Sequence, residues 1–105
     1  MIVTTTDTIP GKNITQTKGI VRGSTVRARH IGKDIMAALR NIVGGEVNEY
    51  TKLLAEAREQ AVMRMTEAAQ ETGGNAVVGT RFITAGIMGG AAEIVAYGTA
   101  VVVED

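Results

Sequence analysis

Cysteine is absent from this chain of 105 residues. Its absence excludes disulfides, thiolate metal sites and cysteine nucleophiles together. Tryptophan is also absent, and the aromatic residues are Tyr50, Phe82 and Tyr97. The core must therefore be made of Ile, Val, Leu, Met and Ala, which bury less area each than aromatic side chains do. We expect a single domain over residues 1–105 that gains burial by associating with further copies of itself.

A net charge is absent as well, because eleven basic residues balance eleven acidic ones. No overall field therefore attracts nucleic acid or an anionic membrane. The two signs are unevenly distributed: residues 1–45 carry seven basic and two acidic groups, whereas residues 46–105 carry four and nine. This opposition can stabilise the chain internally or can make neighbouring copies complementary. The sequence leaves both readings open.

Long apolar runs are missing too. No run approaches the length of a membrane span, and the N-terminal "MIVTTTDTIPG" has neither the basic region nor the apolar stretch of a signal peptide. We therefore expect a cytoplasmic protein that has no membrane partner.

The N-terminal third has the composition of β-strands. Residues 2–6, "IVTTT", are β-branched throughout, which favours a strand. Pro10-Gly11 predicts a type II turn, because proline presets φ at the first corner and glycine accepts positive φ at the second. Imperfect alternation over residues 14–27 predicts a long strand with bends or bulges at Gly19 and Gly23. Together these segments predict a hairpin.

Helical periodicity follows. Apolar residues from Ile31 to Val43 recur on one helical face, and Gly44-Gly45 comes directly after them. A second helical pattern runs from Val47 to Thr72 without proline or glycine and stops at Gly73-Gly74. At ~1.5 Å per residue this second helix would be close to ~40 Å long.

Strand composition returns at residues 75–84 and 93–103, separated by the glycine-rich hairpin tip "AGIMGGAA". Both faces of the last strand are largely apolar, so this strand is central in a sheet or covered by another chain. The order β-β-α-α-β-β predicts an α+β domain with two helices and a mostly antiparallel sheet.

Two features are candidate ligand sites. A phosphate loop needs glycines between a strand and a helix N-terminus, but Gly44-Gly45 follows a helix and precedes Glu46, so it is interpreted as a hinge between helices. His30 is the only histidine and lies four residues before Asp34. On one helix face these two could hold part of a site for a divalent transition metal, although two ligands do not complete a site. A role for His30 in capping the helix is the alternative.

Other chemistry finds less support. A basic stretch could bind the phosphates of nucleic acid; its residues are Lys18, Arg22, Arg27, Arg29 and Lys33. No aromatic residues for base stacking lie among them. A solvated face, or pairing with the acidic helix, therefore explains the stretch better. Ser24 has no identifiable base beside it, and most carboxylates fall on an exposed helix surface. Arg64 and Glu67 suggest an ordinary surface pair on that helix. We therefore predict no catalytic residue, no cofactor-binding motif and no enzyme.

An ordered set of segments resembles the YbjQ-like family of small bacterial and archaeal proteins, which carries a heavy-metal-binding label. These segments are "MIVTTTDTIPGKNI", "DIMAALRNIVGGE" at 34–46, Tyr50, "AREQA" at 57–61, "GGNAVVG" at 73–79 and "GTAV" at 98–101. The resemblance implies a subunit in the fold grouping of dodecin subunits that assembles as a homopentameric ring. A ring would multiply a lone histidine near its axis into several donors.

The chain departs from the family pattern at several positions. Many members have asparagine where His30 stands, arginine where Glu46 stands, and acidic residues where this chain has Thr80, Arg81 and Phe82. Three hypotheses follow. The first is a non-enzymatic, self-assembling ring protein, the second is a heavy-metal-binding protein, and the third is a small-ligand binder or enzyme with its site between subunits.

Overall fold

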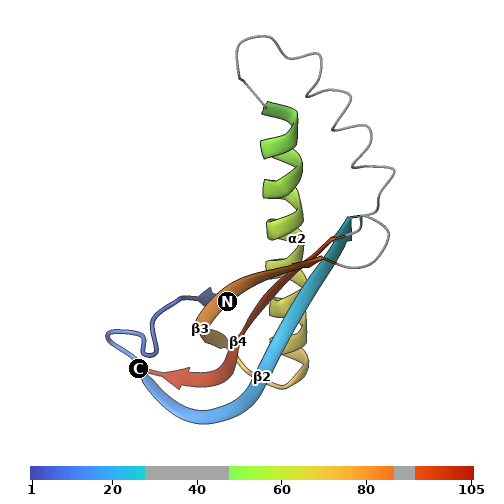
Figure 1. Ribbon diagram of the computed structural model, residues 1–105. Helices are drawn as coiled ribbons and strands as arrows, with labels where there is room; N and C mark the ends of the chain where they lie inside the picture. The colour runs from blue at the N-terminus through green and yellow to red at the C-terminus, as the bar shows by residue number, and fades with distance from the viewer. Residues whose placement is uncertain (28–47, 87–91) are drawn as a thin grey trace.

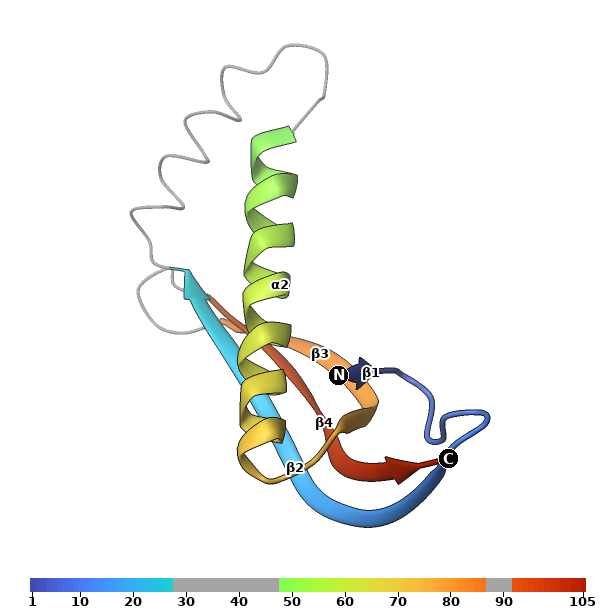
Figure 2. The same cartoon turned by 180° about the vertical axis from the view of Figure 1, so that it is seen from behind.

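The computed structural model describes residues 1–27, 48–86 and 92–105. In these residues one sheet and one helix form two layers (Figure 1), and the helix lies in front of the sheet when the molecule is seen from behind (Figure 2). The elements are β1 (Ile2–Val3), β2 (Asn13–Arg27), α2 (Asn48–Glu71), β3 (Ala76–Gly86) and β4 (Ala92–Glu104). The first part of α2 rises past the end of the sheet, so only the remainder of the helix covers strands.

The strand order in the sheet is β1-β3-β4-β2. β4 is central and runs antiparallel to both β2 and β3, as the two apolar faces of residues 93–103 predict. β1 runs parallel to β3, with Ile2 beside Ala76 and Val3 beside Val77, so the sheet is mixed. The predicted hairpin between the first two strands is therefore wrong, because β1 and β2 lie at opposite edges of the sheet.

The predicted fold class is corrected by the same findings. The described residues hold one helix and four strands in a mixed sheet, not two helices in the order β-β-α-α-β-β with a mostly antiparallel sheet. The predicted helix from Ile31 to Val43 and the Gly44-Gly45 hinge lie outside the described residues. Most of the expected hairpin tip, residues 87–91, lies outside them as well.

α2 forms where Ala, Leu, Glu, Arg, Gln and Met dominate the sequence, because these residues lose little side-chain freedom in a helix. It ends as predicted at Gly73-Gly74. Gly73 has φ 88° and donates its N–H to Gln70 O at 3.0 Å, while Gly74 donates to Ala69 O at 3.1 Å. This pair of bonds is a Schellman motif, which satisfies carbonyls that the helix end would leave without partners.

The main core lies between α2 and the strands β2 and β4. The helix presents buried residues at every fourth position: Ala57, Ala61, Met65 and Ala69. These mostly small side chains bring the helix so close to β2 that Gly23 touches its backbone. A Cβ at position 23 would lie 2.8 Å from the carbonyl carbon of Arg64 and closer still to backbone atoms of Ala61 and Met65. Gly23 is thus a close-approach glycine and not the predicted bend.

The N-terminal segment covers one end of the opposite face of the sheet. Ile9 packs there against a small second core, whose buried members are Ala76, Val78, Val101 and Val103. The predicted turn holds this segment in place, since Lys12 N–H donates to Ile9 O at 3.1 Å and Gly11 has φ 82°. The rest of that face is not covered by the N-terminal segment.

Candidate functional site

Among the residues that the structure describes, the part of the sheet that no other segment covers lies on the face turned away from α2. Along β2 the buried residues Val21, Gly23 and Thr25 face the helix, and Thr25 donates its hydroxyl to Ala57 O at 3.1 Å. Because side chains alternate along a strand, the residues between them point the other way. We call this surface the open face; its residues are Ile20, Arg22, Ser24 and Val26 of β2, Ile83 of β3, and Glu93, Val95 and Tyr97 of β4.

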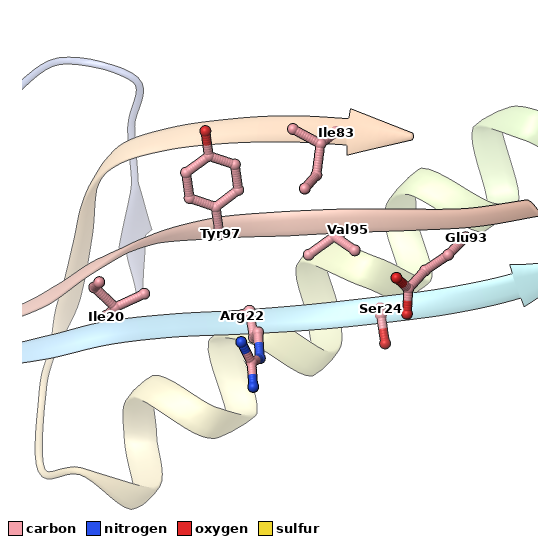
Figure 3. A pocket seen from close by; sticks show the side chains of 7 residues that line it. All are labelled: Ile20, Arg22, Ser24, Ile83, Glu93, Val95 and Tyr97. Carbon is pink, nitrogen blue, oxygen red and sulfur yellow. The ribbon is translucent and has the colours of Figure 1, made fainter. Parts of the chain in front are cut away.

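The register of the strands places these side chains in rows across the sheet. Tyr97 lies between Arg22 of β2 and Arg81 of β3, and Val95 lies between Ser24 and Ile83. Seven of the open-face side chains, all except Val26, line a depression of about 510 Å³. Figure 3 shows them projecting from one side of the three strands, with α2 behind.

Aliphatic side chains dominate the exposure of this face. Ile20 is 83% exposed, and Val26 and Ile83 are each 51% exposed. Fully burying one such side chain is worth ~1.5–3 kcal/mol. Leaving three of them on one side of a sheet therefore forgoes several kcal/mol of stabilisation that a covering surface would supply.

Four of the eight open-face residues are polar, and their groups are mixed in kind: a guanidinium, a carboxylate, a hydroxyl and a phenol. Arginine and tyrosine are enriched in protein–protein interfaces, where an apolar centre is combined with a small number of polar contacts. The register partner of Ser24 is Val95, while Glu93, the carboxylate of the open face, is the register partner of Val26. The composition suits contact with another protein surface.

One predicted polar contact turns out differently, and one ion pair was not predicted. The guanidinium of Arg64 donates to the backbone oxygen of Ser24 at 2.5 Å, which joins α2 to β2 in place of the expected pairing with Glu67. In the part of the chain that the structure describes, the ion pair is Lys12 with Asp105, whose Nζ and Oδ1 are 2.6 Å apart. The hydrogen bond and the charge of Lys12 lower the pKa of the exposed Asp105 carboxyl below its ordinary 3.8.

The predicted basic stretch does not form one surface. Arg22 belongs to the open face, whereas the side chain of Lys18 reaches toward Gly73 at the end of α2. The side chains of Arg27, Arg29 and Lys33 are not described. A cation near the C-terminus of a helix interacts favourably with the helix dipole, which gives Lys18 a structural role.

The predicted metal candidates His30 and Asp34 both lie outside the described residues. Within residues 1–27, 48–86 and 92–105, no three His, Cys, Asp or Glu side chains are grouped so that they could hold a metal ion. No helix in the same residues is both long and apolar enough to cross a membrane. The carboxylates predicted to lie on the wet side of the helix do so, since Glu56, Glu59, Glu67 and Glu71 are exposed.

The open face was not predicted as a site. Arg22 was predicted only as part of the basic stretch and Ser24 only as a nucleophile without a base, and neither was grouped with Tyr97 or Ile83. One signal pointed in the right direction, namely the apolar character of both faces of residues 93–103. Grouping the remaining residues requires the order of the strands, which the sequence did not provide.

Comparison with known proteins now identifies the relatives of this chain. A family model for YbjQ-like proteins, described as "Putative heavy-metal-binding", matches residues 1–104. A UPF0145 protein of Methanosarcina acetivorans is 61% identical over 101 residues, which is 96% of this chain and 95% of that protein. A UPF0145 protein of Clostridium perfringens is 54% identical over 105 residues, covering 100% of this chain and 99% of the other.

A further relative is the UPF0145 protein of Pyrococcus furiosus, which is 61% identical over 104 residues, or 99% of this chain and 91% of that protein. A crystallised protein of unknown function from Pediococcus pentosaceus, assigned to the DUF74 family, shares the fold. It superposes with a TM-score of 0.64 at 17% identity and covers 99% of this chain and 98% of its own. Because the family model spans nearly the whole chain and the relatives match it end to end, this chain belongs to the YbjQ-like family.

Proposed function

We propose that this protein works as a non-enzymatic homo-oligomer, nearest a pentamer, in which copies of the chain cover one another's open faces. The observation that carries the proposal is the exposure of Ile20, Val26 and Ile83 together on one side of the sheet. Monomeric proteins seldom leave a contiguous apolar patch bare, and such patches mark interaction sites. The mixed charges of Arg22 and Glu93 on the same face suit contact with another copy.

Multi-angle light scattering tests the proposal. At micromolar concentration we expect one species with a mass near five chains, and a clean monomer would contradict the proposal. Ile20→Lys places a charge at the most exposed aliphatic position of the open face and should lower the assembled mass. Thr17→Lys adds the same charge to an exposed position of the same strand outside the open face, and it should leave the mass unchanged.

Metal binding is a second candidate, supported by the description of the matching family model. His30 and Asp34 are the residues we would test. A ring with His30 near its symmetry axis would bring several copies of this side chain together. Elemental analysis of tag-free protein should then find stoichiometric transition metal that is lost in His30→Ala. If the purified protein contains no metal and does not bind added zinc, nickel or copper, metal binding is excluded. The cytoplasmic location expected from the sequence stays a prediction, which cell fractionation would test.

A further inference from the structure

The outer edge of β3 is covered along only its first half. Ile2 and Val3 of β1 pair with Ala76 and Val77. The N–H groups of Gly79 and Thr80 then donate to the oxygens of Thr6 and Thr4 at 2.9 and 3.0 Å. From Arg81 to Gly86, β4 is the one neighbouring strand among the residues that the structure describes, and all six residues are exposed.

The chemistry of this second half is unusual for a free edge. The guanidinium of Arg81 turns back toward the covered half, where it donates to Thr5 O at 3.0 Å and to Thr80 O at 2.8 Å. The remaining residues, "FITAG", carry no charge and no proline. Phe82 is 47% exposed and Ile83 is 51% exposed. Natural proteins protect free edges with charges, proline or bulges, because unpaired backbone groups are a template for another strand.

β2 forms the other edge of the sheet and also has a regular half. Its pairing with β4 is interrupted between Ile14 and Gln16 and between Thr17 and Gly19, and bulges of this kind disturb an edge. From Ile20 to Arg27 the pairing is continuous. A regular backbone on the inner side presents equally regular N–H and C=O groups on the outer side, so this half is open to pairing.

The two regular halves lie at the same end of the sheet. Arg22 of β2 and Arg81 of β3 both pair with Tyr97, and at the other limit Arg27 and Gly86 both pair with Ala92. A second copy therefore needs no displacement along the strands to bring its β2 beside β3 of the first. The open faces of the two copies would then lie on the same side of one continuous sheet, because strand pairing preserves the alternation of side chains. When that sheet closes into a ring, the open faces of the copies are turned toward one another and cover each other in its interior.

We propose that Arg81–Gly86 of β3 pairs with Ile20–Arg27 of β2 in a second copy of this chain, so that the sheet runs from copy to copy. The alternative contact of β2 with β2 is symmetric, so it uses the same edge of both copies and stops at a dimer. Pairing β2 with β3 uses both edges of each copy. Such head-to-tail contacts repeat around an axis and close into a ring. This inference rests on the proposed homo-oligomer and specifies the contact that builds it.

The absence of cysteine permits a direct test by engineered disulfides. Paired strands lie ~4.8 Å apart, and a disulfide forms where Cα atoms are within ~7 Å. Three double variants combine Ile83→Cys with Arg22→Cys, Ser24→Cys or Val26→Cys, all on the open face. Within one copy β4 separates the two cysteines, so a bond must join different copies. We expect mild oxidation of at least one double variant to give a ladder of covalent multimers on a non-reducing gel.

The controls separate this inference from the proposed function. Each single cysteine variant should stay uncrosslinked, and so should Ile83→Cys combined with Thr17→Cys in the bulged half of β2. Dimers formed by Ile83→Cys alone would show β3 paired with β3 and overturn the proposal. An oligomeric wild type with no ladder in any double variant would overturn it as well, while the proposed homo-oligomer would stand. A monomeric wild type would overturn both.

Thr84→Lys gives a second measurement that does not depend on disulfide geometry. A charge in the uncharged half of β3 should lower the assembled mass in light scattering while the far-ultraviolet circular dichroism stays unchanged. Unchanged mass in this variant, together with no ladder, contradicts the pairing of β3 with β2. Lost circular dichroism would mean that the variant misfolds, and the disulfide result then decides alone.

Discussion

Replacing Gly23 by alanine should separate α2 from β2. The added Cβ would lie 2.8 Å from the carbonyl carbon of Arg64 and closer still to the Ala61 oxygen and the Met65 nitrogen. All three are backbone atoms of a helix, so no side chain can rotate to make room. The two layers must move apart by roughly 1 Å before the contacts reach an ordinary van der Waals distance.

The size of the effect follows from this geometry. Overpacking of a core costs about 1–3 kcal/mol, and rigid backbone on both sides places this case at the upper end. A gap of 0.5–1 Å also forfeits about a quarter to a half of the dispersion energy of each contact it opens, including those of Ala57 and Met65 with the sheet. We therefore expect a loss of about 3 kcal/mol in the free energy of unfolding.

Urea denaturation followed by circular dichroism measures this loss. For a domain of this size a change of ~3 kcal/mol lowers the midpoint by about 1–3 M. The protein concentration must be held constant, because association would contribute to the apparent stability. Gly86→Ala is the matched control, since nothing lies within 4 Å of its added Cβ. Because Gly86 ends the proposed contact between copies, light scattering must first show that both variants have the assembled mass of the wild type. If both variants unfold at the same midpoint, the close contact between the layers is not a feature of the folded protein.

Three further predictions concern single side chains. Met65→Ala should lower the free energy of unfolding by about 2–5 kcal/mol, because Met65 is 0% exposed. Met63 is 53% exposed, so Met63→Ala should change it by less than ~0.5 kcal/mol. Equal effects of the two variants in chemical denaturation would contradict the packing of Met65. Asn75→Ala removes two hydrogen bonds to β4, of 3.0 and 2.8 Å, and should cost about 1–3 kcal/mol by the same assay, so a neutral result would refute their role. Lys12→Met should return the pKa of Asp105 toward its ordinary 3.8 in a carboxyl NMR titration, and an unchanged pKa would contradict the ion pair. Since the folded pKa is lowered, the small stabilisation from this pair is present above pH 3.8 and is lost as the pH falls through the folded pKa.

Local features of this fold were predictable from the sequence. The turn at Pro10-Gly11 and the end of α2 at Gly73-Gly74 follow from backbone conformations that glycine adopts easily. The bulge near Gly19 follows for the same reason, since this residue has φ 115°. The central place of β4 follows from the apolar character of its two faces.

Strand partners could not be predicted in the same way. β-branched composition indicates a strand but does not name the strand beside it, and β1 joins β3 across more than seventy residues of chain. The predicted strand over residues 2–6 also proved shorter. The backbone of Thr4 and Thr6 still bonds to β3, but threonine hydroxyls add local hydrogen bonds that a regular strand does not have. Thr6 N–H donates to Thr4 Oγ1 at 3.2 Å, and Thr6 Oγ1 donates to Thr8 O at 2.6 Å.

The candidate site depended on the same long-range information. Alternation indicated that Ile20 and Arg22 share a side of their strand, but Gly23 was interpreted as a bend, although it is the point where the helix touches the sheet. Assigning the open face needed both the side covered by α2 and the register with Tyr97. The candidates His30 and Asp34 stay predictions, because they lie outside the described residues.

The alanines of α2 have a consequence for how the helix keeps its position. Of the four buried positions spaced by four residues, three are alanine, namely Ala57, Ala61 and Ala69, and they present small side chains to the sheet. A row of small side chains would pack against the sheet in almost the same way after the helix shifted by four residues, about 6 Å along its axis. Met65 is the one large side chain in this buried row, and it therefore opposes such a shift. Replacing Met65 by a smaller residue would weaken the alignment of the helix with the sheet even if the two layers stayed in contact.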